Sequence, residues 1–223
     1  MKIESTKDLK GKKINICVYG KTGTGKTHLI STIPEKALIL NADKGVLTLR
    51  KSDIDYATCV SWKDVSDFMK YMASKECAEK YKWIIFDSFS AIAEILQYHL
   101  KNEKNMKGFE LWGEYSDKLG EMIRLIRDQE QYSTLSIFES SQSKNADGIT
   151  THAFNIPGDK ISEKVPFYFS NVFSTHCKVK DDKPTYFLQT IPKNGWEGKA
   201  RGVDVLPVEE AHLGKLIKKL LIE

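Results

Sequence analysis

The stretch Gly20-Lys21-Thr22-Gly23-Thr24-Gly25-Lys26-Thr27 decides the fold, because it follows a short apolar run and precedes a segment with helical apolar spacing. It matches G-x-x-x-x-G-K-[ST], in which glycines let successive backbone N–H groups approach phosphate oxygens. In this pattern Lys26 reaches the β- and γ-phosphates, and the Thr27 hydroxyl binds Mg²⁺. We therefore expect Gly20 to His28 to bind a nucleoside triphosphate together with Mg²⁺.

A carboxylate follows the most apolar strand of the sequence. The run Trp-Ile-Ile-Phe at 83–86 is typical of a strand buried in a parallel sheet, and Asp87 comes directly after it. A P-loop protein needs such a carboxylate to hold the hydration shell of the magnesium ion, so Asp87 is the expected metal ligand. The alternative is that Asp87 caps the next helix.

The base that activates water must come from another strand, because Ser88 occupies the position directly after Asp87 where many P-loop ATPases have a glutamate. Asp43 follows the predicted strand 37–41, and its carboxylate would lie at the same sheet edge as the P-loop. Asp43 is therefore the candidate base. Its alternative role is a turn residue before Gly45.

Strands alternate with helices along the chain, which favours a mainly parallel sheet flanked by helices. The expected strands are 14–19, 37–41, 56–60, 83–86 and 133–138, and the expected helices lie after the P-loop, at 61–80, at 89–102 and at 111–130. Residues 141–160 suggest a long polar loop, and residues 172–191 an antiparallel hairpin. We expect one domain over 1–223, with a core at about 12–203 and a basic helix at about 207–222.

Composition narrows the class of protein. The formal net charge is +4, from 34 basic and 30 acidic residues, which excludes a histone-like or polybasic membrane protein but permits a local basic patch. The four cysteines form no C-x-x-C pair, so neither a disulfide framework nor a zinc ribbon is expected. With no apolar run long enough to cross a membrane, we expect a cytoplasmic protein.

The P-loop and the strand–Asp–Ser signature at 83–88 together resemble the RecA-like ATPase core, and most closely the minimal phage RecA-like proteins of the single-strand annealing group. The resemblance implies that Asp43 stands where that family has its catalytic glutamate, and that Gln142 is the γ-phosphate-sensing glutamine. It also implies that the loop carrying Lys101, Lys104 and Lys107 and the loop carrying Lys144 contact DNA.

The same resemblance implies an ATP- and Mg²⁺-dependent ATPase that binds single-stranded DNA in phage recombination or annealing, in the host cytoplasm, alongside a single-strand binding protein. It further implies an oligomer with a shared active site. The extended segment after the hairpin places Lys199 and Arg201 at i and i+2, on one side of the backbone, as a phosphate-directed pair from a neighbouring subunit. Lys193 competes for this role, and a solvated basic turn is the alternative.

Two other functions stay open at this point. One is an ATP-switched interaction or loader protein without direct DNA recognition. The other is a small-molecule kinase, although the chain has only four arginines and no arginine-rich lid. A GTPase is disfavoured, because Asp117-Lys-Leu-Gly120 lies inside a helical pattern and no [NT]-K-x-D motif is present.

Overall fold

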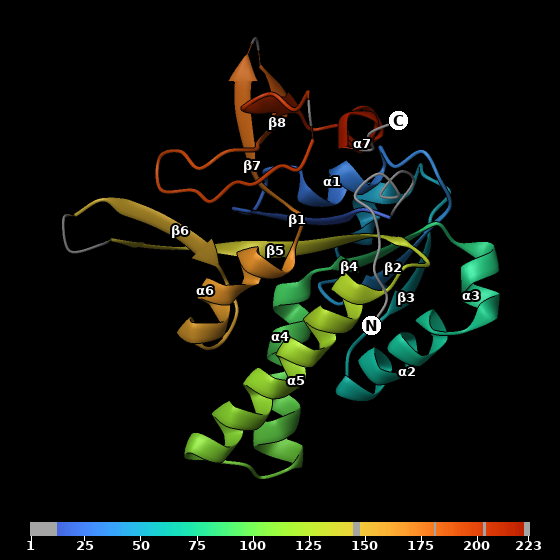
Figure 1. Cartoon of the computed structure of the whole chain (residues 1–223), viewed down its shortest axis with the longest axis vertical. Coiled ribbons are helices and arrows are strands. Elements are labelled where there is room, and N and C mark those ends of the chain that lie inside the picture. Colours follow the sequence, from blue (N-terminus) through green and yellow to red (C-terminus); the bar gives the residue numbers. More distant parts are fainter. Residues whose placement is uncertain (1–12, 145–147, 181, 203, 221–223) are drawn as a thin grey trace, which may run out of the picture.

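A single twisted sheet forms the centre of the protein (Figure 1). The computed structural model describes residues 13–144, 148–180, 182–202 and 204–220, and within them the sheet has the strand order β3-β2-β4-β5-β1-β7-β8-β9, with β6 paired to β5. The strands are β1 (Asn15–Gly20), β2 (Ala37–Asn41), β3 (Asp55–Thr58), β4 (Trp83–Asp87), β5 (Ser133–Lys144), β6 (Thr150–Phe154), β7 (Asn171–Lys180), β8 (Lys183–Gln189) and β9 (Val208–Glu210).

Helices cover both faces of this sheet. The helical segments are α1 (Lys26–Ile30), η2 (Gly45–Leu49), α2 (Trp62–Met72), α3 (Lys75–Lys80), α4 (Phe89–Tyr98), η3 (His99–Glu103), α5 (Gly108–Asp128), α6 (Asp159–Tyr168) and α7 (Leu213–Leu220). One core cluster joins α2 to α6 to one face, and a second joins α1, η2 and α7 to the other. Alternate residues of each strand therefore enter different cores, which explains why residues on both faces of the central strands are buried.

Strands β3, β2, β4, β5, β1 and β7 run parallel, whereas β8, β9 and β6 are antiparallel additions. β5 separates the P-loop strand β1 from β4, which ends in Asp87. The predicted fold class is confirmed at the level of architecture: an α/β domain with a mainly parallel sheet, flanking helices and a late antiparallel hairpin. The carboxyl ends of the parallel strands form one edge, defined by Gly20, Asn41, Asp87 and Glu139, which we call the P-loop edge.

The predicted polar loop at 141–160 is wrong. β5 continues to Lys144 and pairs with β6, and α6 begins at Asp159. Hydroxyls face each other across this exposed ribbon, with 2.9 Å between Ser143 Oγ and Thr151 Oγ1. Because polar side chains occupy both faces of the ribbon, its strands lack the apolar alternation that would have identified them.

Other helix and strand boundaries also differ from the predicted ones. The helix expected over 61–80 is two helices, each with a serine cap, although its predicted capping box between Ser61 and Asp64 is present. The last helix begins at Leu213 rather than at Pro207, because the intervening residues form β9. The predicted limits at 12, 203 and 222 lie outside the described residues. In the part of the chain that the structure describes, no helix has the length and apolarity to span a membrane.

Candidate nucleotide-binding site

The P-loop connects β1 to α1, and the side chain of Lys26 lies inside the turn that it forms. Lys26 Nζ donates to the carbonyl oxygens of Gly20 and Lys21, each at 2.9 Å. Gly25 has φ +85°, and the aromatic ring of Tyr186 lies where its side chain would be, since an added Cβ would come within 2.8 Å of ring carbons. The lysine therefore already points into the loop where phosphate oxygens would replace the carbonyls.

Asp87 is the most deeply buried charge at this edge. It is 1% exposed, and neither of its oxygens makes a hydrogen bond to any described residue. Burial, with a further contribution from Asp43, raises the pKa of this carboxyl to about 7, against the opposing effects of nearby Thr27 and Lys26. An orphaned buried carboxylate beside the P-loop threonine suits Mg²⁺, which takes one or two carboxylates together with substrate phosphates and water.

The capping alternative for Asp87 does not hold. The side chain of Ser88 accepts the hydrogen bond from the Ala91 N–H and so caps α4. Asp87 lies on the α1 side of the sheet, since Ile85, two residues earlier, packs in the same core as α1.

Asp43 lies at the predicted edge of the sheet. Ala42 N–H donates to the Asp87 carbonyl at 2.7 Å, which holds the segment after β2 against the end of β4. A Cβ added to Gly45 would lie 2.9 Å from Asp43 Oδ1 and 3.5 Å from Thr27 Oγ1, so the carboxylate is close to the P-loop threonine. The same Oδ1 accepts the Gly45 N–H at 2.8 Å. Asp43 therefore shapes the turn before Gly45, as its alternative role requires, and also lies beside the P-loop.

Two site residues were missed by the sequence analysis. Asn41 is 2% exposed, has an unpaired Oδ1 among the described residues, and is the direct strand partner of Asp87. Glu139 is the strand partner of Gly20. Burial lowers the pKa of Lys26. Three carboxylates raise it, and Glu139 contributes most of the three. Each is a polar residue at the end of an apolar run, which was the available signal.

A pair of aromatic rings, Tyr186 and His28, lies next to the P-loop. The ring of Tyr186, from β8, lies 5.9 Å from that of His28, from α1. These rings come from segments more than 150 residues apart, and β8 reaches the loop only because it pairs with β7 beside β1. An aromatic surface at this position could stack against a nucleobase.

Gln142 is not brought to the P-loop. Since Glu139 is level with Gly20, Gln142 lies roughly 10 Å farther along β5, at about 3.3 Å per residue, where it pairs with His152. Alternation also puts it on the opposite face from Glu139. Its sensing role stays a prediction that this geometry does not favour.

The cations expected from a neighbouring subunit lie away from the P-loop of their own chain. Lys199 pairs with Val172 at the start of β7, which is level with Cys17, three residues before Gly20. Lys199 Nζ donates to the Pro166 carbonyl at 3.2 Å, whereas the side chains of Arg201 and Lys193 are exposed. Burial, then Arg201, lowers the pKa of Lys199, as expected for two cations on one side.

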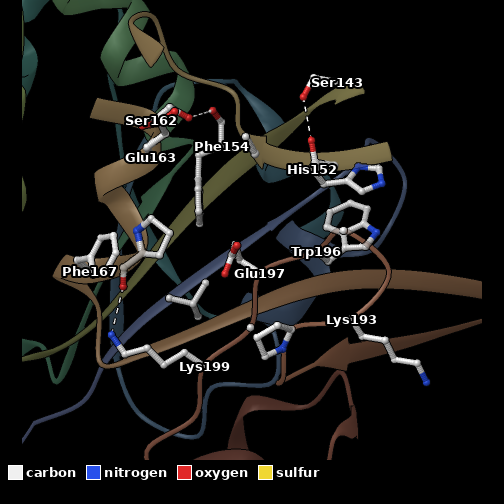
Figure 2. A pocket seen from close by; sticks show the side chains of 17 residues that line it. Ser143, His152, Phe154, Ser162, Glu163, Phe167, Lys193, Trp196, Glu197 and Lys199 are labelled. Atoms are coloured by element: carbon white, nitrogen blue, oxygen red, sulfur yellow. Dashed lines mark hydrogen bonds between the residues drawn. The ribbon is translucent and has the colours of Figure 1, made fainter. Parts of the chain in front are cut away.

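A cavity of about 850 Å³ lies between β6, α6 and the loop 192–199, away from the P-loop residues Gly20 to Thr27 (Figure 2). Glu197 points into it, Lys193 points away, and Phe154, Phe167 and Trp196 line it. Within the described chain, the carboxylates of Glu163 and Glu197 form no ion pair. Two hydrogen bonds connect the cavity wall to Tyr19, the residue directly before the P-loop. The Tyr19 hydroxyl accepts the Glu197 N–H at 2.6 Å and donates to the Glu197 carbonyl at 3.1 Å.

The strand order and the loop between β1 and α1 define a P-loop domain of the ATPase type. A family model described as an AAA domain matches residues 12–202, and the chain belongs to that family.

Two solved structures are similar to this chain. The flagellar accessory protein FlaH from Methanocaldococcus jannaschii has 10% identity and a TM-score of 0.45, over 84% of this chain and 80% of its own. A KaiC-like protein from Pyrococcus horikoshii OT3 has 16% identity and a TM-score of 0.40, over 79% and 77% of the two chains. No curated protein matches the chain.

Proposed function

We propose that this protein is an ATP- and Mg²⁺-dependent ATPase that binds single-stranded DNA in phage recombination or strand annealing. The observation that carries the ATPase part is the meeting of Lys26, Thr27 and the orphaned carboxylate of Asp87 at one sheet edge. Lys26 would exchange its two carbonyl partners for β- and γ-phosphate oxygens. Thr27 and Asp87 would hold Mg²⁺, which neutralises the charge on the phosphates.

The tip formed by η3 and the start of α5 supports the DNA part. Lys101, Lys104 and Lys107 are exposed there, and Phe109 is 99% exposed. Lysines that contact the backbone next to an aromatic ring that can stack on bases are the combination used by sequence-tolerant binders of single strands. Lys144 is exposed near the end of the β5–β6 ribbon and would add a second contact. The phage and annealing setting comes from the resemblance described above, as does a single-strand binding protein as partner.

A fluorescence binding assay with a poly-dT oligonucleotide, with and without ATP, tests the DNA part. Replacing Lys101, Lys104 and Lys107 together by Gln should weaken binding and make the salt dependence shallower by about 0.7 per lost phosphate contact. Phe109→Ala should weaken binding with the salt dependence unchanged. Gln at Lys75, Lys82 and Lys218, which are exposed elsewhere, is the matched control. Equal binding by the two triple variants would contradict the proposal.

The second candidate is an ATP-switched interaction protein without direct DNA recognition. It is favoured by the cavity lined by Glu163 and Glu197, whose wall is bonded to Tyr19, the residue directly before the P-loop. Nucleotide binding could thus alter a partner site. ATP turnover that poly-dT fails to stimulate, together with no binding of the oligonucleotide, would favour this candidate over the first.

A further inference from the structure

Three carboxylates reach the P-loop edge, and their surroundings differ. Asp87 is buried, and its oxygens make no hydrogen bond to any residue that the structure describes, which suits a metal ligand. One oxygen of Asp43 is engaged by the Gly45 N–H, which shapes the turn after β2. Glu139 is exposed and has no such turn to hold. The three groups are therefore suited to different tasks.

The backbone places Glu139 opposite the catalytic lysine. Leu135 and Ile137 pack in the same core as Leu29 and Ile30 of α1, so the next residue on that face of β5 is Glu139. Its level along the sheet is that of Gly20, and β5 is the immediate neighbour of β1. Since α1 begins at Lys26, Glu139 faces the start of that helix.

Neighbouring groups hold Glu139 in place. Asn155 Nδ2 donates to Oε2 at 3.1 Å, and the Asn155 N–H donates to the Glu139 carbonyl at 2.9 Å. The Glu139 N–H donates to Ser90 Oγ at 3.0 Å. The structure gives Oε1 no hydrogen bond to any described residue, so one oxygen is fixed while the other is available to accept a proton.

We propose that Glu139 is the general base for water in this ATPase, an inference that rests on the proposed function. As the water oxygen forms its bond to the γ-phosphorus, Glu139 takes a proton from that water. The bond between the γ-phosphorus and the bridging oxygen breaks, its electron pair stays on ADP, and inorganic phosphate leaves. Asn155 acts as a positioning residue, because it reaches the reaction only through the carboxylate it holds.

Glu139→Gln tests the proposal, because it keeps the size of the side chain and its ability to accept from Asn155. Phosphate release should fall about 10²–10⁴-fold, the usual loss for a general base, while the affinity for a fluorescent ATP analogue stays within about threefold. Asp43→Asn, which tests the base expected from the sequence, should lose less turnover than Glu139→Gln. Glu79→Gln, on the exposed side of α3, is the matched control and should turn over at the parent rate. Asn155→Ala should give an intermediate loss in kcat.

Two results would overturn the proposal: Glu139→Gln turning over at the parent rate, or Asp43→Asn losing more than Glu139→Gln. Circular dichroism and the ATP-analogue titration check that each variant is folded and binds. If the proposed ATPase function itself is wrong, the parent protein and Lys26→Ala will release phosphate at the same background rate. This result distinguishes failure of the proposed function from failure of the Glu139 assignment.

Discussion

The Ser88 hydroxyl accepts a hydrogen bond from the Ala91 N–H at 3.2 Å, so Ser88 rather than Asp87 caps helix α4. The consequence is electrostatic. Asp87 is 1% exposed, and neither of its oxygens has a hydrogen-bond partner among the described residues, a costly arrangement for a charge without a metal ion. The carboxylate is thus poised for Mg²⁺, and its protonation should report on metal binding.

The first prediction concerns that protonation. Because the pKa of Asp87 is raised to about 7, the ligand-free protein binds this proton more tightly than the unfolded chain does. Its contribution to stability is therefore present at low pH and is lost as pH rises from about 4 to 7. Asp87→Asn should stabilise the ligand-free protein at pH 8, by on the order of 2–4 kcal/mol at about 1.4 kcal/mol per pKa unit.

Urea unfolding at pH 5 and pH 8 measures this effect. Mg²⁺-dependent ATP binding should show the opposite trend in the parent protein, weakening below pH 7 as Asp87 takes up a proton. In Asp87→Asn the Mg²⁺ dependence should be lost at every pH. A variant that binds Mg²⁺ and ATP as the parent does would remove Asp87 from the metal site.

The second prediction separates the roles of the two P-loop side chains. Lys26→Ala should fold normally, because its hydrogen bonds go to loop carbonyls that water can also satisfy, but it should lose ATP turnover. Thr27→Ala should instead weaken only the Mg²⁺-dependent part of ATP binding. Thermal melts and titrations with and without Mg²⁺ distinguish the two. Unchanged turnover in Lys26→Ala would show that the pocket is assigned wrongly.

The third prediction concerns the aromatic border of the P-loop. Tyr186→Ala should weaken ATP binding by about 1–3 kcal/mol if the ring stacks on the base, a value typical of base–aromatic contacts. Tyr186→Phe keeps the ring and should bind as the parent does. Inorganic triphosphate has no base, so its affinity should be equal for all three proteins. A loss of triphosphate binding in Tyr186→Ala would instead mean that the ring only supports Gly25.

The fourth prediction is that subunits share the active site. Lys199 is level with Cys17, three residues before Gly20 and roughly 10 Å along the sheet, and the Arg201 N–H donates to the side chain of Asn171, one residue earlier on β7. We therefore expect both cations to serve the P-loop of a neighbour. Arg201→Ala should bind ATP but hydrolyse it poorly, since such fingers contribute up to about 10³–10⁵ in rate. Lys193→Ala is the comparison variant.

Mixing Arg201→Ala with Lys26→Ala should restore part of the turnover, because each subunit supplies what the other lacks. Turnover per subunit should also rise with protein concentration. If turnover is independent of concentration and the mixture shows no recovery, the active site belongs to one chain.

Local signals in the sequence were sufficient for the P-loop, for Asp87 and for the alternation of strands and helices. A glycine-rich turn, an apolar run and a capping box act over a few residues, so their meaning does not depend on the rest of the chain. The strand over 133–138 was found in the same way, but its continuation to Lys144 was not, because its polar residues alternate with other polar residues.

By itself, therefore, the sequence determined the class of fold and the positions of the P-loop and of Asp87 along the chain. Only the tertiary structure decided which side chains lie beside them: Asn41 beside Asp87, Glu139 level with Gly20, and Tyr186 against Gly25. It also separated Lys199 and Arg201 from the P-loop of their own chain. The physical reason is that strand order and register join segments far apart in sequence, and no short-range pattern records which strands become neighbours.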